Sequence, residues 1–203
     1  MPKVKIPRKS TSVDMTAMTD VAFLLLTFFM LATKFKPDEP VQVDTPSSVS
    51  VEKLSEINVM LLSVDKTGRV FYSIDGQPTR QELLRQIGTK YKIDFTPAEQ
   101  KAFSLVTSFG IPVAQMKEFL AMRAEDRSKL QQPGIPSDSL NNELSDWIQL
   151  GRVSNFKVNT VDPNVALKAD AETPYTVVKQ VIATLQDKKV NSFKLITTME
   201  KPE

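Results

Sequence analysis

Asp20 is the residue whose type and position point most directly to chemistry. It lies in the one membrane-length stretch of the sequence, VDMTAMTDVAFLLLTFFMLAT, which covers residues 13–33. The uncharged part after it, residues 21–33, would form a helix of roughly 20 Å, short of a hydrocarbon core of roughly 30 Å. A helix that crosses the bilayer here must therefore include Asp20, at a cost of roughly 2.5 to 3.5 kcal/mol near its centre.

Two threonines extend this carboxylate into a narrow polar seam. Thr16 and Thr27 lie on the same helix face as Asp20. Lipid offers no polar partner, so such a seam faces a neighbouring helix or a hydrated path. A low dielectric disfavours a charged carboxylate, so Asp20 is suited to loading and releasing protons. The alternative is that Asp20 only hydrogen-bonds a neighbouring helix and that Thr16 and Thr27 only bond helix carbonyls.

Asp14 is the second acidic residue of the segment. At the helix start it is expected to cap the first turn and to oppose the helix dipole, with a proton-relay role as the alternative. The 203-residue chain has no histidine and no cysteine, which removes thiolate chemistry, disulfides, zinc fingers and every histidine-dependent triad. We therefore expect no metal, no cofactor and no enzyme active site.

The distribution of charged residues predicts how the chain is oriented across the membrane. Four basic residues precede the membrane-length segment, and beyond it basic and acidic residues balance at 22 each, without the basic excess of a nucleic-acid binder. A signal peptide is the alternative, but Asp20 interrupts the apolar run and KFKPDEP offers no small-x-small cleavage pattern. The positive-inside rule then places residues 1–12 in the cytoplasm, residues 13–33 in the membrane, and the rest, in a bacterium, in the periplasm.

Residues 34–56 form a polar stretch with three prolines and are expected to be an extended linker. The alternation at Val41-Gln42-Val43, before Pro46, suits either a short strand against a partner or a solvated tether.

Residues 57–203 show the pattern of a folded domain. Asp65 to Gly68 separate two β-rich runs, as in a hairpin. Capping-box pairs at Thr79/Glu82 and Thr96/Glu99 predict helices to about Tyr91 and about Phe109. Further elements are expected as helices over 112–130, 140–150 and from Thr173, a loop over 131–138, and strands over 164–169 and 192–198.

The order of these elements predicts the fold class. Without residues 94–155 they run strand, strand, helix, strand, helix, strand, which indicates a small two-layer α+β domain with a helical insertion. Trp147 is expected to anchor the core of that insertion, which is a candidate partner-binding or dimerisation surface. The whole chain then reads as a single N-terminal transmembrane helix plus this periplasmic domain.

Several segments resemble the ExbD/TolR biopolymer-transport family. The membrane motif is DMTAMTDV at residues 14–21, and the other matches are the linker VQVDTPS at 41–47 and ALKAD with Pro174-Tyr175 before the last helix. Ala17 stands where many members have proline, and Thr45 stands where leucine usually precedes the linker proline. The resemblance covers about residues 1–92 and 160–200, and leaves the insertion unexplained.

The resemblance implies a motor subunit of the ExbD type. Such chains pair as homodimers inside a ring of an ExbB-like polytopic partner, and protons that cross through the membrane aspartate drive a TonB-like periplasmic client. Asp20 matches that aspartate, Thr16, Thr27 and Asp14 would support it, and Val41, Val43 and Pro46 would dock a partner. A TolR-like or gliding-type stator, or a membrane-tethered periplasmic adaptor, is the alternative.

Overall fold

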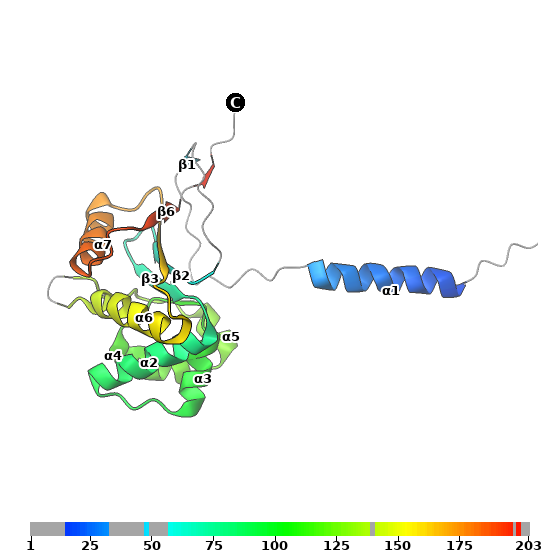
Figure 1. The fold of residues 1–203 in the computed structure, drawn as a ribbon, viewed down its shortest axis with the longest axis horizontal. Coiled ribbons are helices and arrows are strands. Elements are labelled where there is room, and N and C mark those ends of the chain that lie inside the picture. The colour runs from blue at the N-terminus through cyan, green and yellow to red at the C-terminus, as the bar shows by residue number, and fades with distance from the viewer. Residues whose placement is uncertain (1–14, 33–46, 49–56, 139–140, 197, 200–203) are drawn as a thin grey trace, which may run out of the picture. The chain divides into compact units, whose positions relative to one another are not determined.

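The computed structural model describes residues 15–32, 47–48, 57–138, 141–196 and 198–199 (Figure 1). The chain divides into two compact units, residues 1–37 and residues 38–203. In the first unit the described element is the apolar helix α1, Met15–Ala32. This helix is the one candidate membrane span among the described residues, so the predicted single N-terminal apolar helix is confirmed.

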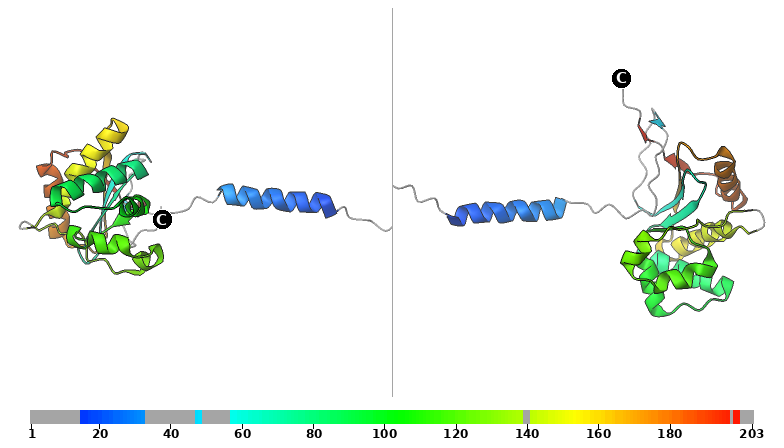
Figure 2. Two further views of the ribbon diagram at one scale, coloured as in Figure 1. Left: turned by 90° about the horizontal axis from the view of Figure 1, so that it is seen from below. Right: turned by 180° about the vertical axis from the view of Figure 1, so that it is seen from behind.

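The second unit is built on a mixed five-stranded sheet of order β4-β3-β2-β5-β6. β2 pairs with β3 in antiparallel register and with β5 in parallel register. Figures 1 and 2 show α2 and α6 lying side by side below the sheet. The described elements are β1 (Ser47–Ser48), β2 (Val59–Val64), β3 (Val70–Ile74), α2 (Gln77–Tyr91), α3 (Pro97–Leu105), β4 (Ser108–Phe109), α4 (Val113–Ala121), α5 (Ala124–Lys129), α6 (Glu143–Asn159), β5 (Asn164–Ala169), α7 (Tyr175–Asp187), β6 (Lys194–Ile196) and β7 (Thr198–Met199).

One face of this sheet carries the core. Along β2 burial alternates, so that Met60, Leu62 and Val64 are fully buried while Val59 and Leu61 are half-buried. Alternate residues of a strand point to opposite faces, which identifies the helix-covered face. A single apolar cluster joins that face to side chains from α2, α3, α4, α6 and α7. The predicted two-layer α+β architecture is confirmed.

The β2–β3 hairpin turns where the sequence predicts it. Gly68 has a φ of 84°, and its N–H donates to the Asp65 carbonyl at 2.9 Å. The Asp65 carboxylate accepts from the Thr67 and Arg69 backbone N–H groups, both at 2.9 Å. Burial by itself would raise the pKa of Asp65, but hydrogen bonds from the Thr67 hydroxyl and the Arg69 backbone N–H, together with the Arg69 guanidinium, outweigh it and lower that pKa.

Helix starts follow the sequence in one case and depart from it in another. Thr96 and Glu99 form the predicted capping box of α3, with Pro97 at its first position. The capping box predicted at Thr79 is wrong. α2 begins earlier, after Gly76, whose φ of 86° turns the chain into the helix, and Thr79 lies fully buried inside it.

Helix ends differ where tertiary contacts compete. The helix predicted to reach Phe109 stops at Leu105, because Ser108 and Phe109 pair with β3 as strand β4. The helix predicted over 112–130 is broken into α4 and α5 around Met122. The helix predicted to end at 150 continues as α6 to Asn159, past Gly151.

The segment 94–155 is part of the core. Trp147 is fully buried and packs edge-on to Phe109 at a ring distance of 4.8 Å, with Tyr72 of β3 at 6.1 Å. The predicted anchoring role of Trp147 is confirmed. The segment is mostly helical, yet β4 adds an edge strand to the sheet, so the family-like elements and the insertion share one aromatic cluster.

Residues of the predicted linker also pair with the end of the chain. Ser47–Ser48 form β1, parallel to β7, in a separate two-stranded sheet. The rest of residues 34–56, Val41, Val43 and Pro46 included, lies outside the described residues.

Candidate functional site: a carboxylate in the membrane helix

Helix α1 has the size and surface of a membrane span. Its 18 residues rise about 27 Å, close to the thickness of a hydrocarbon core. Its leucine, phenylalanine and methionine side chains are exposed, and none of its residues is buried. An exposed helix whose surface is largely apolar is suited to lipid or to partner helices.

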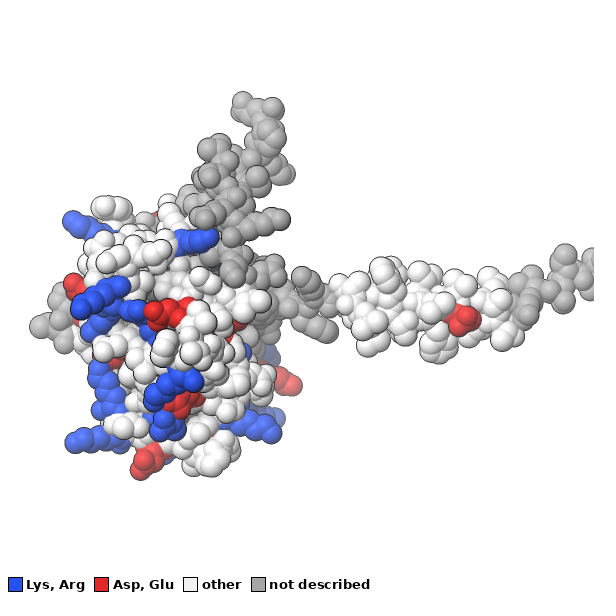
Figure 3. Space-filling model, in the orientation of Figure 1, with Lys and Arg blue, Asp and Glu red and all other residues white. Residues whose placement is uncertain are grey.

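Asp20 is the one charged residue between Met15 and Ala32. Figure 3 shows acidic atoms in red on the otherwise uncharged visible face of this helix. The side chain is exposed, and Thr16 and Thr27, one turn before and two turns after, lie on the same helix face. α1 therefore presents the predicted polar seam to whatever surrounds it.

The threonine hydroxyls of this helix bond its backbone. Thr27 donates its hydroxyl to the carbonyls of Phe23 at 2.9 Å and Leu24 at 3.0 Å, and Thr19 donates to the Met15 carbonyl at 2.6 Å. Such bonds satisfy the hydroxyl proton in lipid and leave the oxygen lone pairs free to accept. The Thr27 oxygen can thus accept a hydrogen bond from a neighbour while its hydroxyl group still donates to a backbone carbonyl.

One further threonine bonds the helix backbone beside the predicted set, but a residue next to Asp20 in the sequence does not share its helix face. Thr19 was not predicted as a site residue, although a threonine directly before an intramembrane aspartate is visible in the sequence. Asp14 lies outside the described residues. Among the described residues no group of three or more acidic, histidine or cysteine side chains is placed to hold a metal ion.

Charged side chains of the second unit mostly tie its elements together. The Glu82 carboxylate accepts from Arg85 on the same helix at 2.7 Å and from Lys157 of α6 at 3.0 Å. The hydrogen bond from Arg85 is the main cause that lowers the pKa of Glu82 to about 2, with Gln86 and Lys157 adding to it against the effect of burial. Lys90 and Tyr91 bind Asp146 in the same way.

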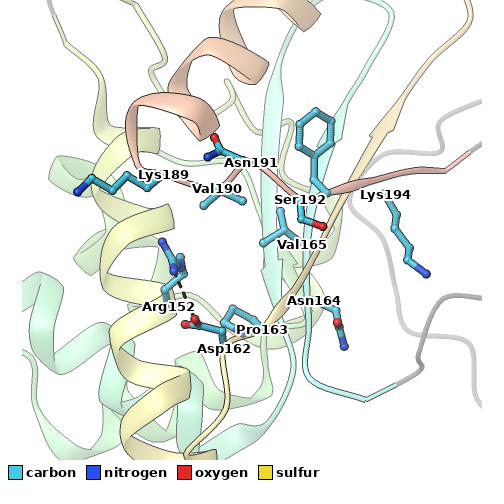
Figure 4. A pocket seen from close by; sticks show the side chains of 11 residues that line it. Arg152, Asp162, Pro163, Asn164, Val165, Lys189, Val190, Asn191, Ser192 and Lys194 are labelled. Atoms are coloured by element: carbon cyan, nitrogen blue, oxygen red, sulfur yellow. Dashed lines mark hydrogen bonds and ion pairs between the residues drawn. The ribbon is translucent and has the colours of Figure 1, made fainter.

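The second unit has surface hollows that the sequence does not reveal. One of about 330 Å³ lies where α6, the start of β5 and the approach to β6 meet (Figure 4). Arg152 pairs with Asp162 across it at 3.4 Å, while Lys189 and Lys194 point away from its centre. Lys189 and Lys194 are visible in the sequence as charged residues, but the fold alone brings them near Arg152 of α6.

Comparison with known proteins gives one match. The sequence model of the biopolymer transport protein ExbD/TolR family matches residues 7–200, which includes α1 with Asp20 and both ends of the sheet. No curated protein and no solved structure matches the chain. The family match spans nearly the whole sequence, the segment 94–155 included. This chain, which joins an apolar helix with one carboxylate to a mixed α/β domain, thus belongs to the ExbD/TolR family of biopolymer transport proteins.

Proposed function

We propose that this chain is the ExbD-like subunit of an inner-membrane motor that uses the proton-motive force to energise TonB-dependent transport across the outer membrane. Its N-terminus lies in the cytoplasm, α1 crosses the inner membrane once, and the sheet domain lies in the periplasm. It works as a homodimer inside a ring of an ExbB-like polytopic protein and acts on a TonB-like client.

Asp20 carries this proposal. A lone carboxylate in an otherwise uncharged membrane-length helix costs free energy that a structural role does not return, and such residues mark proton and ion pathways. With no histidine or cysteine in the chain, a carboxylate is the available proton carrier. One charge that crosses the membrane supplies roughly 2.3 kcal/mol per 100 mV, so work is gathered over repeated turnover.

The seam around Asp20 supports proton exchange. The Thr27 hydroxyl donates its proton to the carbonyls of Phe23 and Leu24, so its oxygen can accept a hydrogen bond from water or from a partner on that helix face. Thr16 completes the polar face at the other end. In the assembled complex this face lies against the partner ring, where a hydrated path delivers the proton.

Substitution of Asp20 tests the motor. Asp20→Asn keeps the size and hydrogen-bonding capacity of the side chain but removes its acid, so we expect normal membrane insertion and normal co-purification with the polytopic partner, with loss of proton-gradient-dependent transport. Asp20→Glu restores the acid and should retain part of the activity. Normal transport by Asp20→Asn would contradict the motor function. It would favour the adaptor function, in which the periplasmic domain binds a partner and Asp20 is structural.

The two branches of the family are separated by complementation. Expressed with its own polytopic partner, an ExbD-like chain restores uptake through TonB-dependent receptors, whereas a TolR-like chain restores resistance of the envelope to detergents. We expect the first result. Restored envelope integrity without uptake would assign the chain to the TolR-like branch, and restored surface motility to a gliding-type stator.

The linker is the second proposed contact. We expect Val41→Ser with Val43→Ser, or Pro46→Ser, to reduce transport while the folded domain keeps its thermal stability, because these residues would dock a partner in the active complex. Val51→Ser, in the same polar stretch, is the matched control. Equal transport by all of these variants would remove the docking role.

A further inference from the structure

The outer face of α6 carries an apolar surface beside a hollow of about 690 Å³. We call it the α6–α7 hollow. It is lined by Gln149, Val153 and Phe156 of α6 and by Asp187, Lys188 and Lys189 at the end of α7. Phe156 is 55% exposed and Val153 42% exposed. Both are large apolar side chains, and they lie three residues apart on one helix face.

The core does not account for these two side chains. α6 faces the sheet and α2 with other residues, among them Trp147, Ile148 and Gly151, which are buried. Val153 and Phe156 lie on the opposite side, where a solvent-facing helix usually carries polar residues. Contiguous exposed apolar groups with a polar rim mark protein-binding sites on soluble domains.

The rim of the hollow is basic. Arg152, Lys157, Lys188 and Lys189 outnumber Asp162 and Asp187 by four to two. Lys157 is held by Glu82 and Arg152 by Asp162. Over the part of the chain that the structure describes, the ammonium groups of Lys188 and Lys189 have no ion-pair or hydrogen-bond partner. They are therefore available to an anionic ligand.

The hollow adjoins the smaller one in Figure 4, since Arg152, Asp162 and Lys189 line both. Together they offer room for several residues of a polypeptide. The basic rim around two apolar side chains favours an acidic polypeptide segment that places an apolar side chain on this surface.

We propose that the α6–α7 hollow docks an acidic segment of a partner protein, with an aliphatic or aromatic side chain against Val153 and Phe156 and carboxylates on Lys188 and Lys189. Exposed aromatics packed in a pocket are typical centres of binding energy, and rim charges steer and orient the partner. The proposal does not use proton transfer, so Asp20→Asn should leave docking unchanged. Failure of the motor proposal and failure of this one are thereby distinguishable.

The absence of cysteine makes a direct test possible. Gln149→Cys in the full chain, held in nanodiscs, places one environment-sensitive dye at the edge of the hollow without removing Val153 or Phe156. The probe is a 12-residue synthetic peptide in which leucines alternate with glutamates. We expect a saturable blue shift with micromolar affinity, and no response to the same peptide with lysine in place of glutamate.

Variants locate the contact. Phe156→Ser, and Lys188→Glu with Lys189→Glu, should each weaken peptide binding about tenfold or more, as expected for a pocket anchor and its charges. Val158→Ser is the matched control, because Val158 is similarly exposed on the same helix but does not line the hollow. Its binding should equal that of the parent chain. Thermal unfolding by circular dichroism confirms that each variant is folded.

Four outcomes would overturn the proposal. The first is the absence of a saturable response, and the second is unchanged peptide binding by a folded Phe156→Ser variant. The third is a blue shift without peptide that appears only in nanodiscs with anionic lipid. The fourth is a blue shift without peptide that grows with the concentration of the chain. The third would assign the surface to the membrane, and the fourth to a second copy of the chain.

Discussion

Tyr72 puts a hydroxyl group into the middle of the aromatic core. It is fully buried, and the structure gives this oxygen no hydrogen-bond partner within the described residues. Burial raises the pKa of Tyr72, so the phenol stays neutral at any ordinary pH. An unsatisfied buried hydroxyl costs about 1 to 3 kcal/mol.

Removal of that hydroxyl should therefore not harm the fold. We expect Tyr72→Phe to unfold with a free energy equal to that of the parent or higher by up to about 2 kcal/mol. Chemical denaturation followed by tryptophan fluorescence of Trp147 measures this directly. A loss of more than about 1 kcal/mol would mean that the hydroxyl has a partner, such as a buried water.

Gly151 depends on the same contact. A Cβ added there would lie 2.0 Å from the Tyr72 hydroxyl oxygen and 2.9 Å from the Met60 terminal carbon. We expect Gly151→Ala to destabilise the domain by about 1 to 3 kcal/mol through overpacking. Combined with Tyr72→Phe, the loss should shrink, because the nearest atom is gone. Additive free energies in this double-mutant cycle would contradict the packing.

At the scale of elements, Glu82 joins α2 to α6 through Lys157. The pKa of Glu82 is lowered from 4.5 to about 2, chiefly by the hydrogen bond from Arg85 on the same helix and then by Gln86 and Lys157. These bonds therefore stabilise the fold fully above pH 4.5 and are lost as pH falls toward 2. After allowance for solvent screening we expect a loss of about 1 kcal/mol. Glu82→Gln should flatten part of the acid side of a stability–pH curve, with Glu118→Gln, an exposed residue of α4, as the control.

Within the described residues, Asp65 in the hairpin turn is a second acid-sensitive carboxylate, because its pKa is also lowered. Its contribution is present above pH 3.8 and fades as pH falls through the lowered value. A Glu82→Gln variant with unchanged acid sensitivity between pH 4.5 and 2 would show that the bonds of Glu82 to Arg85, Gln86 and Lys157 do not stabilise the fold.

The segment 94–155 belongs to the fold rather than to its periphery. It supplies Phe103, Phe109 and Trp147 to the cluster around Tyr72, and β4 to the sheet edge. Deletion of residues 94–155 should therefore abolish cooperative thermal unfolding of the sheet domain. A deleted chain that still melts cooperatively would instead support a detachable, accessory surface.

The sequence predicts the elements better than their ends. The hairpin at Asp65 to Gly68, the capping box at Thr96 and strand β5 are visible because turn chemistry and alternation are local signals. Gly151 misleads, because a glycine at a helix end and a glycine that makes room for Tyr72 look the same in sequence. β4 is two residues long and owes its existence to pairing with β3.

The candidate site is likewise predictable from the sequence only in part. Asp20 stands out from the sequence because one carboxylate interrupts an apolar run, and the periodicity of a helix gives its face. The hydrogen bonds of Thr19 and Thr27 need the backbone to be placed, and the α6–α7 hollow needs two segments thirty residues apart to meet. Tertiary neighbours are what a local pattern leaves out.

At the scale of the whole molecule, the membrane helix and the sheet domain are separate compact units. We expect distant sites in such units to contribute independently, within about 0.5 kcal/mol. Asp20→Asn should accordingly leave the thermal unfolding of the sheet domain unchanged while it abolishes transport. Trp147→Ala should instead lower the free energy of unfolding of the sheet domain by about 3 to 5 kcal/mol and should leave membrane insertion intact.

Measurement of both properties on both variants separates the two units. Domain melting is followed by circular dichroism in nanodiscs, and insertion by extraction of washed membranes. An Asp20→Asn chain whose sheet domain melts earlier would show that the carboxylate acts on stability, and its lost transport would then say nothing about protons. An unchanged melting curve ties the loss to the acid itself, because the amide matches the carboxyl group in size but cannot release or bind the proton that the motor needs.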